Sequence, residues 1–148
     1  MSEKKTIMVV DDHEDIRTVV STILDFGGYD CVPMENGKKA LGYLSNAKNA
    51  AGVSVIILDI LMPEMNGLQV LQALKHQVHT RNIPVVMLTT EGMSKDIIKG
   101  YNTGADYYIT KPFTSSQVLF GLDMVLSQEG EDPISRKMPE DEDHEGLQ

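Results

Sequence analysis

Short apolar runs alternate with helix-like segments along the whole chain, and this alternation limits the fold more than any other feature. The runs lie at residues 7–10, 29–34, 53–58, 83–88 and 107–109. Nearly continuous apolar runs of this length are typical of strands that are buried on both faces of a parallel sheet. Strands that alternate with helices form such a sheet through right-handed crossovers, with helices on both faces. We therefore expect an α/β fold with a doubly wound, five-stranded parallel sheet.

Five helix-like segments accompany these runs. Their apolar residues recur at spacings of three and four, as on one face of a helix, within residues 16–24, 40–44, 68–74, 94–102 and 114–128. Gly27 and Gly28 are expected to end the first helix, and Thr114 and Gln117 have the spacing of a capping box at the start of the last one. The polar residues 45–52 are expected to form a connection into the third strand.

Polar residues stop three of the apolar runs. Asp11 and Asp12 follow the first run, Asp59 follows the third, and Lys111 follows the fifth. In open parallel sheets the ligand site lies beyond the carboxyl ends of the strands, which is where these residues fall. The two acidic runs are neighbours if the strand order is 2-1-3-4-5. Crowded carboxylates need a cation, and oxygen ligands favour a hard divalent ion such as Mg²⁺.

Composition and charge narrow the class of protein. A chain of 148 residues fits one domain with a substantial core. The net charge of −9 argues against nucleic-acid binding, which needs clustered Lys and Arg. No apolar stretch approaches the length of a membrane span, so we expect no membrane partner and a cytoplasmic location. The single cysteine, Cys31, excludes an internal disulfide and is expected to be a small core residue.

The acidic charge is concentrated in residues 129–148. This segment holds eight acidic and two basic residues, a net charge of −6 out of the chain's −9. The acidic ones are Glu129, Glu131, Asp132, Glu140, Asp141, Glu142, Asp143 and Glu145. Few large apolar residues accompany them, so the segment is predicted to be a disordered, solvated extension or linker. The expected division is a folded domain at 4–128 and an acidic segment at 129–148.

The motifs at the strand ends resemble those of one family. They are Val9-Val10-Asp11-Asp12, Leu58-Asp59, Met62-Pro63-Glu64-Met65-Asn66-Gly67, the segment 84–89, Gly104-Ala105-Asp106 and Lys111-Pro112-Phe113. In this order and spacing they resemble the receiver domain of bacterial two-component response regulators, the CheY-like family. The resemblance implies a flavodoxin-like fold with sheet order 2-1-3-4-5 and five helices.

The resemblance also implies a phosphorylation site. Asp59 would be the phosphoacceptor, since a carboxylate can attack phosphorus once the phosphoryl charge is neutralised. Asp12 and Asp59 would ligate Mg²⁺ directly, and Asp11 would act mainly through water. The backbone carbonyl of Leu61 would complete the protein ligands.

Further residues take roles by the same resemblance. Lys111 would pair with Asp59 and then with a phosphoryl oxygen, and a cis peptide bond is expected before Pro112. The Thr89 hydroxyl would bind another phosphoryl oxygen, and Tyr108 would be the switch aromatic that turns inward with it.

Three side chains are expected to tune the lifetime of the phosphorylated state. Leu61 and Glu91 lie two residues after Asp59 and Thr89, where they would border the path of the attacking water. Thr90 would narrow access to the site.

Simpler readings compete at several positions. Asp12 is also a candidate cap for the first helix. Thr89 could be a routine strand end, and Tyr108 could be a packed strand aromatic. His13 adjoins the acid pair but is expected to be an exposed loop residue and not a metal ligand.

The function that follows is a stand-alone response regulator, not an enzyme. It would take a phosphoryl group from a sensor histidine kinase or a histidine phosphotransfer protein. It would then bind a downstream protein through the face built by helix four, strand five and helix five. A receiver cut from a larger regulator or hybrid kinase, and a phosphorelay shuttle, are the related alternatives.

Two unrelated classes fit less well. An aspartate-nucleophile phosphohydrolase needs a second Asp two positions after its nucleophile, but His13 follows Asp11 at that spacing and Glu14 follows Asp12. A flavin-binding module needs an anion-binding loop after strand one, and the acidic loop here would repel phosphate.

Overall fold

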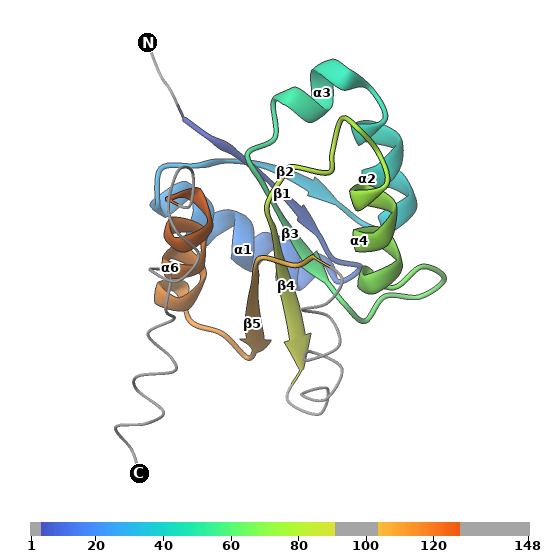
Figure 1. Cartoon of the computed structure of the whole chain (residues 1–148). Helices are drawn as coiled ribbons and strands as arrows, with labels where there is room; N and C mark the ends of the chain where they lie inside the picture. Colours follow the sequence, from blue (N-terminus) through green and yellow to red (C-terminus); the bar gives the residue numbers. More distant parts are fainter. Residues whose placement is uncertain (1–3, 91–103, 128–148) are drawn as a thin grey trace.

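The computed structural model describes residues 4–90 and 104–127 (Figure 1). Its five strands are β1 (Thr6–Val10), β2 (Asp30–Met34), β3 (Val55–Asp59), β4 (Val85–Thr90) and β5 (Tyr107–Lys111). All neighbouring strands pair in parallel, in the order β2-β1-β3-β4-β5. The predicted doubly wound sheet and its strand order are confirmed.

Helices cover both faces of the sheet (Figure 1). They are α1 (Glu14–Phe26), α2 (Gly37–Leu44), α3 (Ala47–Ala51), α4 (Gly67–Lys75) and α6 (Ser115–Leu126). Helices α1 and α6 pack on one face, and α2 and α4 pack on the other. The helix predicted at 94–102 lies outside the described residues. None of the helices in the described part of the chain has the length and apolarity needed to cross a membrane.

Alternate residues of each central strand enter opposite layers of the core. In β1, Ile7 and Val9 belong to the cluster under α1 and α6, while Met8 and Val10 belong to the cluster under α2 and α4. All four side chains are fully buried. Double-sided burial explains why the central strands read as continuous apolar runs. Strand β2 lies at an edge, where Pro33 is tolerated although it lacks an N–H to donate.

The predicted helix ends are largely confirmed. Helix α1 ends at Phe26, and Gly28 adopts a φ of 88°, a conformation that favours glycine. Thr114 and Gln117 form the predicted capping box of α6 through two reciprocal hydrogen bonds of 3.1 and 2.9 Å.

Cys31 is only partly buried, packs against the core, and lies 3.2 Å from the Ser21 hydroxyl. Burial raises the pKa of its thiol, as expected for a structural cysteine.

The connection predicted at 45–52 contains a helix that the sequence analysis did not predict, because residues 47–51 form the short helix α3. The Asn46 side chain caps it by accepting a hydrogen bond from the backbone N–H of Asn49 at 3.0 Å. Ala47, Ala50 and Ala51 have high helix propensity, and Ala50 is buried. Three alanines carry no strong apolar periodicity, so the pattern in the sequence concealed a real helix.

Gly67 sets how closely α4 approaches the end of β3. A Cβ at this position would collide with the backbone carbonyl oxygen of Asp59 and would lie 2.7 Å from the Cα of Ile60. Backbone atoms of a buried strand end cannot move aside without displacing the strand. We therefore expect Gly67→Ala to lower the free energy of unfolding by about 1–3 kcal/mol, as overpacking does, measured by urea denaturation.

Gly42 provides the matched control within α2. A Cβ there meets nothing within 4 Å, so Gly42→Ala should raise the free energy of unfolding by about 0.5–1 kcal/mol through helix propensity. Equal effects of the two substitutions would contradict a tight approach at Gly67.

Candidate functional site

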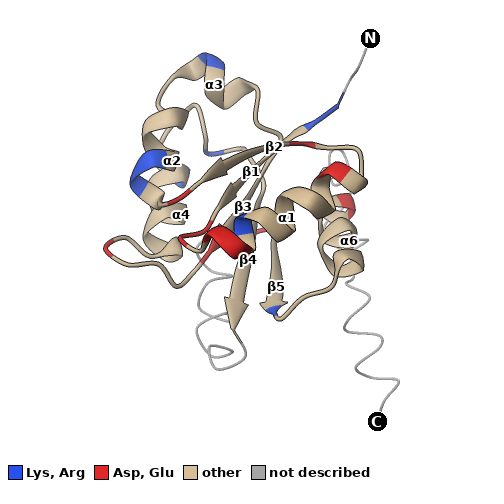
Figure 2. Cartoon of the chain, turned by 180° about the vertical axis from the view of Figure 1, so that it is seen from behind, with Lys and Arg blue, Asp and Glu red and all other residues tan. Residues whose placement is uncertain are grey.

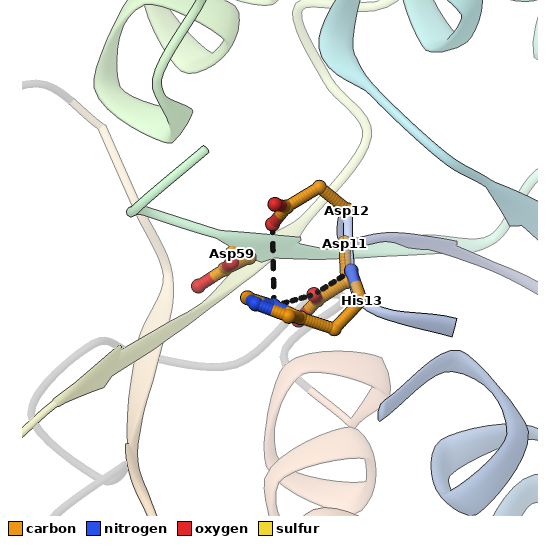
Figure 3. Close-up of side chains that lie close together, drawn as sticks. All are labelled: Asp11, Asp12, His13 and Asp59. Carbon is orange, nitrogen blue, oxygen red and sulfur yellow. Dashed lines mark hydrogen bonds and ion pairs between the residues drawn. The ribbon is translucent and has the colours of Figure 1, made fainter. Parts of the chain in front are cut away.

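The ends of β1 and β3 bring three carboxylates together. Asp11 and Asp12 follow β1 directly, and Asp59 is the last residue of β3. Val10 pairs with Leu58 in the sheet, so the acidic residues lie at the same edge. Figure 3 shows the side chains of Asp11, Asp12 and Asp59 gathered there, and Figure 2 shows the acidic residues of this region close to the start of α1. The prediction that the two acidic strand ends are neighbours is confirmed.

Two of these carboxylates are buried. Asp11 is 0% exposed and Asp59 is 2% exposed, whereas the Asp12 side chain is 25% exposed. The backbone of Asp11 is held on both sides, because its N–H donates to the Met34 carbonyl at 3.1 Å and its carbonyl accepts from the Arg17 guanidinium at 2.7 Å. The sequence patterns did not single out Arg17, although its place one turn into α1 faces the end of β1.

Lys111 supplies the compensating positive charge. It is the last residue of β5, and its ammonium nitrogen lies 3.1 Å from Asp11 Oδ2 and 3.2 Å from Asp59 Oδ1. Its side chain is 17% exposed, so both ion pairs are shielded from water. Strand β4 lies between β3 and β5 in the sheet, and Lys111 reaches past its end. The expected pairing with Asp59 is present, and the equal contact with Asp11 is additional.

His13 also contacts the acid pair. Its Nδ1 lies 3.3 Å from an oxygen of Asp11 and 3.3 Å from an oxygen of Asp12 (Figure 3). The side chain is 64% exposed, as predicted, but sequence reasoning missed its closeness to both carboxylates. His13 occupies the N-cap position of α1 without a side-chain cap bond, so the interpretation of Asp12 as the helix cap is wrong.

The surroundings of Asp59 oppose its ionisation. Burial, and next the negative charge of Asp11, raise the pKa of the Asp59 carboxyl from 3.8 to about 6. The Lys111 ammonium and the nearby backbone N–H of Leu61 lower the pKa but do not offset these effects. A single ammonium therefore serves two buried carboxylates, and the site has a deficit of positive charge.

The donor atoms at this edge fit a small, hard cation. Asp59 Oδ2 and Asp12 Oδ1 are buried and accept no hydrogen bond from any described residue, although the His13 ring Nδ1 lies 3.3 Å from Asp12 Oδ1. Ligand atoms of Asp11, Asp12, His13 and Asp59 all lie within 4.8 Å of one another. Carboxylate oxygens are the ligands that Mg²⁺ prefers, and buried acceptors without a donor are stabilised by a cation. The cluster is therefore suited to Mg²⁺.

The remaining predicted residues lie around this cluster. Thr89 is 1% exposed, and its hydroxyl donates to the Thr90 carbonyl at 3.3 Å. Tyr108 pairs with Met87 in the sheet and packs on the side of α2 and α4, with its hydroxyl oxygen buried. The Lys111–Pro112 peptide bond is cis, as expected. Leu61 is 52% exposed beside the site. Glu91 lies outside the described residues.

Comparison with known proteins identifies the family. The family model of the response regulator receiver domain matches residues 7–122. The chain belongs to this family. Receiver domains are signalling phosphoacceptor domains and not classical enzymes.

Curated relatives include transcriptional regulators. The phosphate regulon transcriptional regulatory protein PhoB of Pseudomonas aeruginosa is 36% identical over 126 residues, which cover 85% of this chain and 53% of that protein. The PhoB of Escherichia coli is 37% identical over 122 residues, which cover 82% of this chain and 52% of that protein. The chain thus spans about half the length of these relatives.

Solved structures include shorter relatives. The chemotaxis protein CheY4 of Vibrio cholerae is similar with a TM-score of 0.75 and 32% identity, covering 83% of this chain and 99% of that one. A signal receiver domain of a histidine kinase from Syntrophus aciditrophicus has a TM-score of 0.74 and 32% identity, covering 83% and 90%. The receiver fold therefore accounts for nearly the whole of these chains.

The raised pKa of Asp59 has a measurable consequence for stability. When a carboxyl binds its proton more tightly in the folded state than in the unfolded state, the free energy of unfolding of the protein falls as pH rises from about 4 to about 6. Without metal, Asp59→Asn should therefore raise the free energy of unfolding at pH 7.5, by up to about 3 kcal/mol for a shift of about two pKa units. Denaturant titrations in chelator across pH 4–8 measure the difference, which should shrink towards pH 4.

Asp30→Asn is the matched control. The Asp30 side chain is 59% exposed and its ion pair with Lys4 spans 3.9 Å, so its effect should stay within about 0.5 kcal/mol at any pH. An Asp59→Asn variant that is no more stable than the wild type at neutral pH would contradict the charge deficit.

Proposed function

We propose that Asp59 accepts a phosphoryl group from a sensor histidine kinase or a histidine phosphotransfer protein. The observation that carries this proposal is the arrangement around Asp59. One carboxylate oxygen is held by Lys111 at 3.2 Å, and the other is buried and accepts no hydrogen bond from a described residue. Membership of the receiver family supports the same role.

The proposed chemistry is an in-line displacement. A carboxylate oxygen of Asp59 bonds to phosphorus while the bond between phosphorus and the imidazole nitrogen of the donor breaks, and the imidazole departs with the electron pair. Lys111 passes from the Asp59 carboxylate to a phosphoryl oxygen, so its charge follows the negative charge as it moves. The Thr89 hydroxyl binds a second phosphoryl oxygen after a rotation away from the Thr90 carbonyl.

Mg²⁺ completes the proposed site. Asp12 and Asp59 would hold the ion directly, Asp11 through water, and Leu61 through its backbone carbonyl. When bound, the ion would supply positive charge that offsets the negative charge of the carboxylates and of the phosphoryl group. This role matches the charge deficit that raises the pKa of Asp59.

Phosphorylation would then shift an existing equilibrium between two conformations. Movement of Thr89 opens space at the end of β4, and Tyr108 on the neighbouring strand turns with it. The face made by the predicted helix 94–102, β5 and α6 changes shape and binds a downstream protein.

The proposal assigns the receiver to residues 4–128 and places the chain in the cytoplasm. Signalling by protein contact suits the net charge of −9 of the whole chain, which disfavours contact with nucleic acid. A free-standing regulator corresponds to CheY4, which is covered over 99% of its length. A receiver within a longer regulator corresponds to PhoB, and a phosphorelay shuttle would return the phosphoryl group to a histidine. Reading the complete open reading frame separates the first two.

Intact-mass spectrometry tests the phosphorylation. The full chain with Mg²⁺ and acetyl phosphate should gain one phosphoryl group, because Asp59, among the described acidic residues, is almost fully buried and has a carboxylate oxygen that accepts no hydrogen bond. Asp59→Asn and a chelator should each abolish the gain, and Asp30→Asn should preserve it. A gain that persists in Asp59→Asn would overturn the assignment. If no gain in mass is seen, a beryllofluoride-binding assay distinguishes two cases. Binding indicates that the phosphoryl group is lost quickly, and no binding indicates that the site does not accept it.

Leu61 provides a second test, of the lifetime. Its side chain is 52% exposed and lies two residues after Asp59. Leu61→Asn should speed loss of the phosphoryl group about 3- to 10-fold, because an amide can position a water and one hydrogen bond is worth about 1 kcal/mol. The half-life after removal of the donor measures the effect. Val78→Asn, at a residue that is 66% exposed elsewhere, is the matched control. An unchanged half-life in Leu61→Asn would refute the tuning role.

A further inference from the structure

A cavity of about 560 Å³ lies at the amino-terminal ends of the strands, whereas the acidic site lies at their carboxyl-terminal ends. Lys5, Ser54, Pro84 and Asp106 line it, and each precedes the first residue of its strand. The strands that follow them are β1, β3, β4 and β5 in turn, so the cavity lies at the amino-terminal ends of four strands. The last turn of α6 contributes Leu126 to its wall.

Most of the charged side chains that line this cavity are basic. Lys5, Lys75 and Arg81 line it, and no described acidic residue forms an ion pair with any of them. The single acidic side chain in the lining is Asp106, whose carboxylate accepts a hydrogen bond from the backbone N–H of Val85 at 2.9 Å. Figure 2 shows the basic ribbon that leads into β1, at the far end of that strand from the acidic residues. A positively charged cavity in a chain of net charge −9 is suited to an anionic ligand.

The chain itself carries a matching anionic segment. It continues from the end of α6, which forms the rim of the cavity, into the acidic residues 129–148. Within that segment, five of the six residues 140–145 are acidic. Thirteen residues, 127–139, separate this run from Leu126. A linker of that length has a typical end-to-end distance of roughly 20 Å, so the run can return to the cavity without strain.

We propose that the cavity binds the acidic run at residues 140–145 of the same chain. Its carboxylates would pair with Lys5, Lys75 and Arg81, and the short linker would keep their effective concentration high. The contact would be reversible and sensitive to salt, because exposed ion pairs are screened at high ionic strength. It requires neither phosphorylation nor Mg²⁺, so its test is independent of the proposed function.

Paramagnetic broadening in the full chain tests this contact. A nitroxide attached to Gly146→Cys, in a Cys31→Ser background, reports where the acidic run lies. We expect the backbone amides of Lys5, Ser54 and Asn82 to lose most of their intensity, and those of Glu64 and Asn66 at the acidic edge to keep it. The broadening should disappear in 1 M salt, where the Debye length is about 3 Å.

Charge variants provide the matched controls. Lys75→Gln with Arg81→Gln should remove the selective broadening. Lys38→Gln with Lys39→Gln makes the same change of charge on α2 and should leave it intact. Neutralising the run by replacing its five acidic residues with Gln or Asn should also abolish it. Broadening that survives neutralisation, or none at the cavity, would overturn the proposal.

A mixed sample tests whether the segment comes from the same chain or from a second copy. It contains ¹⁵N-labelled chains without a nitroxide and chains at natural isotope abundance that carry the nitroxide. Absence of broadening in this mixture supports binding within one chain. Equal broadening in the mixture would show instead that the cavity binds the acidic run of a second copy, and would overturn the assignment.

Discussion

The Lys111 ammonium, held between the carboxylates of Asp11 and Asp59, is the interaction on which the rest of the site depends. It joins three strands, β1, β3 and β5, at an edge where two acidic side chains are almost completely buried. A buried ion pair contributes little net stability, but loss of the shared Lys111 ammonium would leave two buried carboxylates uncompensated and would cost about 3–5 kcal/mol. The arrangement therefore requires the sheet order that sets the ends of these strands beside one another.

The site is built with less positive charge than its carboxylates need. The raised pKa of Asp59 expresses this deficit, and so do the buried oxygens of Asp59 and Asp12 that accept no hydrogen bond from a described residue. Natural proteins keep such unfavourable arrangements where function needs them, at some cost in stability. A divalent cation at this cluster would relieve part of the repulsion between the like charges. The same deficit of positive charge therefore favours a cation as the ligand of this cluster.

The parallel sheet gives the molecule two ends of opposite character. Its carboxyl-terminal edge collects Asp11, Asp12 and Asp59, and its amino-terminal edge collects the basic side chains around the cavity. Helix α6 connects them, because it begins after the cis peptide bond at Pro112 and ends at the cavity rim. A chain that leaves the last helix of this fold therefore starts far from the acidic cluster and next to a surface that attracts negative charge.

Local pattern determined much of this protein. Runs buried on both faces predicted the strands. The acidic residues that stop two of them predicted the location of the site and supported the sheet order that the family resemblance implied. Thr114 and Gln117 predicted the start of α6, because a capping box depends on residues within a span of four positions. Helix α3 was missed, since its alanines carry no apolar periodicity. Only the tertiary structure decided that Lys111 contacts Asp11 across 100 positions, that His13 lies against both acids, and that Lys5, Lys75 and Arg81 share one cavity. Such distances depend on how helices and strands pack, and periodicity within a segment records only which face of that segment is buried.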